Sequence, residues 1–237
     1  MQPGCALAEV HEFQGFPHLF IRILAIYSKE KKNTMANTGN PDYAKLNLYI
    51  KFLKEQLAFE PTSAALHYNL GLAYTHRGLN AEAISEFKQA LECDPNLAQA
   101  YVNLGGLYAG SDPEKSIEAN TKALEIDPNL GPAHSNLAYC YLRKGNFEKA
   151  VLHGQKAMEL MPGSPKAYQL LAAAYIGSGE LEASAELSRK MLDEGVSSAA
   201  AHFNLSIALR ALGRQEEAEE HTRAARELGY VPDGEQE

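Results

Sequence analysis

The chain has 237 residues, of which 45% are hydrophobic and 22% are charged, and its formal net charge is -8. This composition is too apolar for an intrinsically disordered protein, and the sequence has no uninterrupted apolar run of membrane-spanning length. Because a phosphate backbone requires a basic protein surface, the negative charge argues against non-specific nucleic-acid binding and against an anionic membrane surface.

Residues 1–40 are predicted to be a poorly ordered or mis-assigned N-terminal segment. Its apolar stretch around Phe20 follows Glu9 and Glu12, whereas a secretory signal would carry basic residues there. The stretch also falls short of the roughly 20 apolar residues that a membrane-spanning helix needs. Two interpretations stay open for residues 1–34, which are either a disordered arm of the protein or an extension that precedes a true start at Met35.

Residues 41–61 are predicted to form a capping helix or half repeat. Ile50 and Leu53 precede Pro61 by intervals that recur further along the chain before Pro95. The apolar spacing is that of a helix. Such a helix would cover the open apolar end of the array that follows.

A period of 33 or 34 residues extends through residues 62–232. A fixed period in this range is typical of a stacked repeat architecture. Leucines, tyrosines and prolines all follow it. The columns are Leu70, Leu104, Leu137, Leu171 and Leu205; Tyr74, Tyr108, Tyr141 and Tyr175; and Pro61, Pro95, Pro128 and Pro162. The five units run over residues 64–97, 98–130, 131–164, 165–198 and 199–232.

Each unit is predicted to contain two helices. In the first unit, Leu70 and Tyr74 share one helical face, and Ala83 and Phe87 share another. A single pair of helices leaves an apolar face exposed to water, and stacking the pairs buries it. Glycines separate the two helices, where a helix C-terminus favours a residue that tolerates positive φ. They are Gly78, Gly145, Gly179 and Gly213.

These columns resemble the tetratricopeptide repeat pattern in spacing and in most residue types. The residues that carry the resemblance in the first unit are Leu70, Gly71, Tyr74, Ala83, Phe87 and Pro95. The resemblance implies an all-α fold, a right-handed α-solenoid of helix-turn-helix repeats. The family's Phe of the second helix is kept only at Phe87, and we expect its replacements to loosen the packing between neighbouring repeats. The replacements are Asn120, Gly154, Ser188 and Thr222.

The first helices of the five units contain no acidic residue, although 21 Asp and Glu residues lie between positions 64 and 232. First helices line a concave groove in this family, so the resemblance implies a neutral to weakly basic groove within an acidic outer surface. Burial alone also excludes carboxylates from helices, and this alternative stays open. A groove of this kind fits a protein or peptide partner that is neutral, acidic or apolar.

The family's groove positions imply a set of peptide-binding residues in this chain. Side-chain amides offer a donor and an acceptor together, so a ladder of Asn residues could hold a peptide backbone. Gly106 would leave a notch for a bulky partner side chain, unless the second repeat is simply degenerate. The candidates are Asn69, Asn103, Asn136, Asn204, Tyr68, Leu72, Gly106, Tyr139, Arg143, Lys166 and Arg210, with Leu142, Phe203 and Ile207 beside them.

No catalytic, cofactor or metal site is predicted. His67, His134 and His202 recur at intervals of two repeats, too far apart to share a metal ion, and we interpret them as packing residues. No nucleophile or phosphate-loop context is present.

The three cysteines, Cys5, Cys93 and Cys140, are far apart in sequence and predict neither a disulfide framework nor a zinc site. We expect each to be a small buried side chain in a reducing compartment, and therefore a cytoplasmic protein.

The sequence thus predicts a non-enzymatic protein–protein interaction scaffold that binds a peptide or partner-protein segment in a concave groove, for complex assembly. The alternative is a regulatory or substrate-recruiting subunit of an enzyme such as a glycosyltransferase, because similar repeats precede sugar-transferase catalytic domains. The 237 residues leave no room for such a domain beside five repeats, which favours the scaffold.

Overall fold

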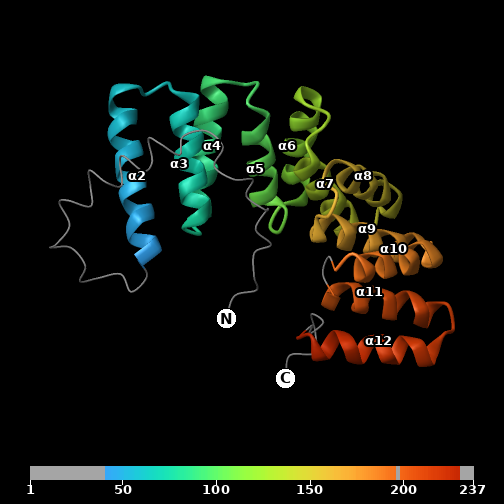
Figure 1. Ribbon diagram of the computed structural model, residues 1–237. Helices are drawn as coiled ribbons and strands as arrows, with labels where there is room; N and C mark the ends of the chain where they lie inside the picture. Colours follow the sequence, from blue (N-terminus) through green and yellow to red (C-terminus); the bar gives the residue numbers. More distant parts are fainter. Residues whose placement is uncertain (1–40, 196–197, 230–237) are drawn as a thin grey trace. The chain divides into compact units, whose positions relative to one another are not determined.

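A computed structural model describes residues 41–195 and 198–229 of the chain. These residues form eleven helices, α2 to α12, and no strand (Figure 1). The fold is an all-α helical repeat solenoid, which confirms the predicted class. The predictions for residues 1–40 and 233–237 lie outside the described residues.

The helices alternate between the first and second members of each predicted unit. Among the described residues, α2 precedes the five units. The first helices are α3, α5, α7, α9 and α11, and the second helices are α4, α6, α8, α10 and α12. Their bounds are α2 Pro41–Phe59, α3 Ala64–His76, α4 Asn80–Cys93, α5 Ala98–Tyr108, α6 Pro113–Ile126, α7 Gly131–Arg143, α8 Phe147–Leu160, α9 Pro165–Ser178, α10 Leu181–Asp193, α11 Ser198–Ala211 and α12 Gln215–Glu227.

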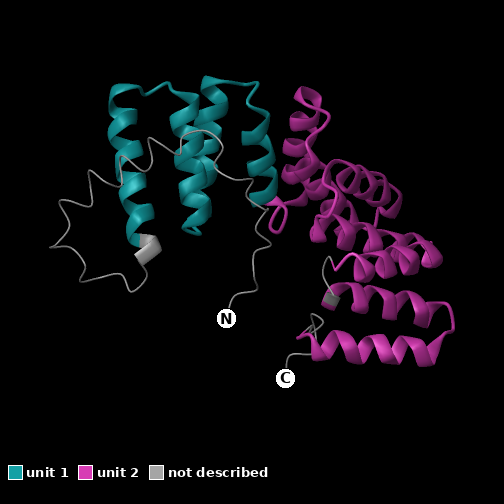
Figure 2. Cartoon of the chain, in the orientation of Figure 1, with its two compact units in different colours: residues 1–107 teal, residues 108–237 magenta. Residues whose placement is uncertain are grey.

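The chain divides into two compact units, residues 1–107 and residues 108–237 (Figure 2). The boundary lies inside the second predicted repeat, directly after Gly105, Gly106 and Leu107. Helices α2 to α4 and all of α5 but its last residue belong to unit 1, and α6 to α12 belong to unit 2. The period alone does not predict this division.

Unit 1 is organised around the α3–α4 hairpin, with α2 packed against α3. Phe87 of α4 is fully buried, and Leu70 of α3 is 1% exposed. A Cβ atom added at Gly71 would lie 2.7 Å from the Phe87 ring. The close approach of α3 to this aromatic ring therefore requires glycine at position 71.

Unit 2 is a sequential stack in which each helix from α6 to α12 packs against the next. The first helices also contact one another, α7 with α9 and α9 with α11. The periodic leucines of these helices, Leu137, Leu171 and Leu205, are at most 2% exposed. The 34-residue leucine period thus corresponds to one buried layer per repeat.

Two replacements of the family's Phe pack more closely than we expected. A Cβ atom at Gly154 would lie 3.2 Å from the Leu171 Cα, so the backbone of α9 approaches α8 at this glycine. Asn120 is fully buried, and its Nδ2 donates a 2.8 Å hydrogen bond to the Ser116 carbonyl. At these positions a short backbone approach and a hydrogen bond take the place of the missing aromatic ring.

The predicted helix breaks are confirmed. Gly78, Gly145, Gly179 and Gly213 have φ values of 71°, 71°, 84° and 78°. This left-handed region strains residues that carry a side chain, which explains why glycine stands at the end of these first helices.

Candidate functional site

Nine partly or fully exposed residues of α7, α9 and α11 form one surface of unit 2, here called the first-helix face. Each of them lies three, four or seven residues from another on the same helix, which places them on one side. These three helices contain no Asp or Glu. The surface therefore combines apolar and basic side chains without a carboxylate from these helices. Its residues are Tyr139, Leu142, Arg143, Lys166, Gln169, Ile176, Phe203, Ile207 and Arg210.

Arg143 joins this surface to the end of α5. Its Nη1 donates hydrogen bonds to the carbonyl oxygens of Ala109, at 3.1 Å, and Gly110, at 2.8 Å. The guanidinium carbon lies 5.9 Å from the centroid of the Tyr139 ring. The side chain thus satisfies two carbonyls that follow a helix C-terminus while its charge stays beside an aromatic ring.

Two members of the predicted Asn ladder are buried. Asn136 is 3% exposed, and its Nδ2 lies 3.2 Å from Oδ1 of Asn120, to which it donates. Cys140 extends the network with a 3.1 Å contact from its Sγ to the Ser116 hydroxyl. Asn204 of α11 is 8% exposed. A peptide would reach the Asn136 amide only by opening this buried network.

In unit 1 the structure brings two predicted residues together. Asn103 Nδ2 of α5 donates to the Tyr68 hydroxyl of α3 at 3.2 Å, and also to the Gln99 carbonyl at 2.9 Å. The Tyr68 ring packs against Phe87 with the ring centroids 5.7 Å apart. Burial raises the pKa of the Tyr68 phenol, although the Asn103 hydrogen bond opposes the shift. The partly exposed candidates of this unit also include Asn69, Leu72 and Gly106.

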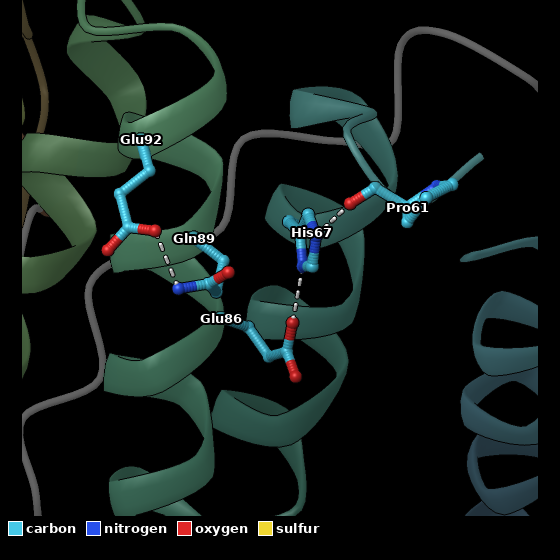
Figure 3. Close-up of polar contacts among 5 residues, drawn as sticks. All are labelled: Pro61, His67, Glu86, Gln89 and Glu92. Carbon is cyan, nitrogen blue, oxygen red and sulfur yellow. Dashed lines mark hydrogen bonds and ion pairs between the residues drawn. The ribbon is translucent and has the colours of Figure 1, made fainter. Parts of the chain in front are cut away.

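The sequence-based interpretation missed that His67 has a polar partner on the second helix. Figure 3 shows its ring between the Glu86 carboxylate and the Pro61 carbonyl. The His67 Nδ1 lies 2.7 Å from Glu86 Oε2, and the Nε2 lies 3.1 Å from the Pro61 oxygen. A separate contact on α4 runs from Gln89 Nε2 to Glu92 Oε2 at 2.9 Å.

The equivalent histidines of unit 2 each face a second histidine, and we call these pairs the histidine dyads. The Nδ1 atoms of His134 and His153 are 2.9 Å apart, and those of His202 and His221 are 2.8 Å apart. In all three repeats the partner follows 19 residues later. The sequence could have indicated these partners, because His153 and His221 are also separated by two repeats.

Both dyads favour neutral imidazoles. Burial lowers the pKa of all four rings, and it acts together with the neighbouring His134 and Lys149 to bring the pKa of His153 to about 4. The other two rings, His202 and His221, are partly exposed.

The cysteines differ from one another in exposure. Cys140 is buried, as we expected, and burial raises the pKa of its thiol. Cys93 is exposed at the last residue of α4, so the expectation of burial was wrong for this residue. Both are free thiols. Within the part of the chain that the structure describes, no helix has the length and apolarity to cross a membrane.

Three stretches of the sequence match family models described as tetratricopeptide repeat. They cover residues 62–129, 119–151 and 199–224. A search of curated protein sequences gives no significant match.

Solved structures similar to this chain include a MamA fragment from Desulfovibrio magneticus RS-1, with 23% identity and a TM-score of 0.64, covering 72% of this chain and 97% of that one. PilW, described as a widely conserved type IV pilus biogenesis factor, has 19% identity and a TM-score of 0.69, with coverage of 91% and 96%. YrrB, described as a TPR protein with an unusual peptide-binding site, has 18% identity and a TM-score of 0.65, with coverage of 77% and 93%. At these identities the likeness shows the fold alone.

Proposed function

Because this chain belongs to the tetratricopeptide repeat family, we propose that it is a non-enzymatic interaction scaffold that binds a peptide or partner-protein segment through its first helices. The observation that carries the proposal is the first-helix face, an apolar and basic surface to which α7, α9 and α11 contribute no carboxylate. The peptide-binding site named in the description of YrrB supports a role of this kind for the fold. We place the protein in the cytoplasm and assign it to complex assembly.

The apolar residues of this surface supply the anchors. Tyr139, Phe203 and Ile207 are each partly exposed, so they are neither core residues nor fully hydrated. Aromatic side chains with apolar neighbours are typical of the few contacts that dominate binding energy at an interface. A partner segment with one or two bulky apolar side chains would bury them here.

The basic residues set the charge preference of the partner. Lys166 and Arg210 lie on α9 and α11, and Arg143 lies at the end of α7. Complementary charge speeds association and disfavours wrong partners. The partner segment is therefore neutral or acidic between its apolar anchors.

Unit 1 contributes a second binding region of the same kind. Asn69 and Asn103 are partly exposed and are the ladder members suited to hold a peptide backbone. Tyr68, Leu72 and Gly106 would contact apolar side chains of a segment bound to this unit. Asn136 and Asn204 remain candidates only for a partner that displaces their buried surroundings.

Selection of peptides from an unbiased display library on the full chain tests this function. The expected peptides combine Asp or Glu with bulky apolar residues, and Arg210→Glu should weaken their binding at least about tenfold. The matched control is Arg223→Glu, which makes the same charge change on an exposed residue of α12. Selection of basic peptides, or equal losses in the two variants, would refute the proposed surface.

A further inference from the structure

We propose that the C-terminal histidine dyad, His202 and His221, binds a divalent transition-metal ion of the zinc type, with Glu217 as a third ligand. This inference is independent of the peptide-binding function. His202 lies on α11 and His221 on α12, so the ion would connect the two helices of the last repeat.

The two ring nitrogens already converge. The Nδ1 atoms of His202 and His221 are 2.8 Å apart, and the rings stack with centroids 5.0 Å apart and planes inclined by 30°. Two imidazoles on a tetrahedral zinc ion, bonded at about 2.0–2.1 Å, have their nitrogens about 3.3 Å apart. An outward movement of roughly half an ångström would therefore make room for an ion between the two Nδ1 atoms, and the ring that holds the shared proton would change to the tautomer protonated at Nε2. Both residues are partly exposed.

Imidazole ligands must be neutral to bind a metal, and the 2.8 Å contact between the two Nδ1 atoms requires at least one of them to carry no proton. Burial lowers the pKa of both rings. Around His221, Arg189 opposes a positive charge, whereas Glu217 and Glu220 favour one.

The two dyads differ in the residue that lies one helical turn before the histidine of the second helix. Glu217 precedes His221 by four residues, which places its carboxylate on the same side of α12. In the structure Glu217 pairs with Arg214, and it would turn toward the ion when this exposed ion pair opens. The described residues contain no preassembled group of three metal-ligating side chains, so ion binding requires this rearrangement.

The central dyad is an internal control. There Lys149 takes the place of Glu217, and its ammonium lies 5.2 Å from the centroid of the Tyr141 ring, which stacks on His153. His134 is only 9% exposed. Lys149 offers no third ligand in the place of Glu217, and this pair is less accessible, so zinc should occupy the C-terminal dyad and not this one.

Isothermal titration of the untagged full chain with zinc chloride at pH 7.5 tests the site. The expected result is one main site whose affinity falls at least about tenfold in His221→Gln and about tenfold in Glu217→Lys. His153→Gln is the matched control and should bind as the wild type does. Lys149→Glu should add a second site at the central dyad.

A zinc titration of the wild type, followed by the histidine ring signals in its NMR spectrum, does not depend on how the variants fold. The signals of His202 and His221 should shift first as zinc is added. Absence of binding, unchanged affinity in His221→Gln, or a first shift at His134 and His153 would overturn the site.

Discussion

His134 and His153 face each other across the α7–α8 hairpin with their Nδ1 atoms 2.9 Å apart. A hydrogen bond between two imidazoles needs one donor and one acceptor, so the pair cannot form it with both rings protonated. The His134 Nε2 lies 3.2 Å from the Pro128 carbonyl and is therefore the protonated nitrogen of that ring. This leaves the His134 Nδ1 to accept the proton of His153, so the contact is lost when His134 itself becomes protonated.

The first prediction is that the unfolding free energy decreases as the pH is lowered, because this dyad takes up protons. Folding lowers the pKa of His134 and brings the pKa of His153 to about 4, with Lys149, Lys156 and Glu159 as the charged neighbours. Protons therefore bind the unfolded chain more tightly, so the contribution is complete above about pH 6.5 and is lost as the pH falls toward 4. Because the pair is partly solvated, we expect a loss of about 1 kcal/mol between pH 7.5 and pH 5.

Urea unfolding at the two pH values, with a chelator present, measures this loss. The matched variant is His153→Gln, which cannot titrate at this position and should show a smaller drop between the same two pH values. An equal drop in the variant and the wild type would mean that other groups cause the pH dependence.

The second prediction concerns the close approach of α8 and α9. Adding a methyl group at Gly154 forces the Leu171 backbone outward, because the new Cβ would lie 3.2 Å from its Cα. Overpacking of this kind costs about 1–3 kcal/mol, so Gly154→Ala should destabilise the protein despite its higher helix propensity. Gly110→Ala is the control, since no atom lies within 4 Å of its added Cβ. Denaturant midpoints that move equally for the two variants would contradict the packing explanation.

The third prediction concerns the buried amide of Asn120. Its replacement by Ala removes the acceptor of the Asn136 amide and the donor to the Ser116 carbonyl. Losing one partner of a buried hydrogen bond costs about 1–3 kcal/mol, and Asn120→Ala should lower the unfolding free energy by that amount. The same change at Asn96, which is exposed, should alter it by less than about 0.5 kcal/mol. Thermal and urea unfolding of the two variants make the comparison.

The fourth prediction separates two adjacent cations at the end of α7. Arg143→Ala should destabilise the protein by about 1–2 kcal/mol, because Arg143 donates to the Ala109 and Gly110 carbonyls. Lys144→Ala removes only an exposed ion pair with Glu114 and should destabilise the protein much less than Arg143→Ala does. If Lys144 proved the more important residue in unfolding experiments, the proposed role of Arg143 at this helix end would be wrong.

Local and periodic features of this fold were predictable from the sequence. The leucine column identified buried core positions, and glycines at the helix breaks adopt the positive φ values that their positions require. Both depend on one residue type at one backbone position. A single repeat is therefore enough to predict these features, and their recurrence in the other repeats strengthens the prediction.

Pairings between side chains were harder to predict. The periodic position of Asn136 predicted that it lines a groove. In the structure its amide donates to the buried Asn120, which stands where the family has an aromatic residue. Likewise, the sequence showed the periodic histidines of the first helices. Their partners, His153 and His221, could be found only by comparing the second helices at the positions 19 residues later. Such pairs depend on how two helices face each other, which a period does not specify.

The interaction role is tested most directly by site-specific cross-linking in native lysate. A photoreactive aromatic residue replaces Tyr139 on the first-helix face in one variant, and Leu152, which is 56% exposed on α8, in the other. We predict that the variant at position 139 captures a discrete protein and that the variant at position 152 does not. Capture at position 152 with none at 139 would contradict binding through the first helices.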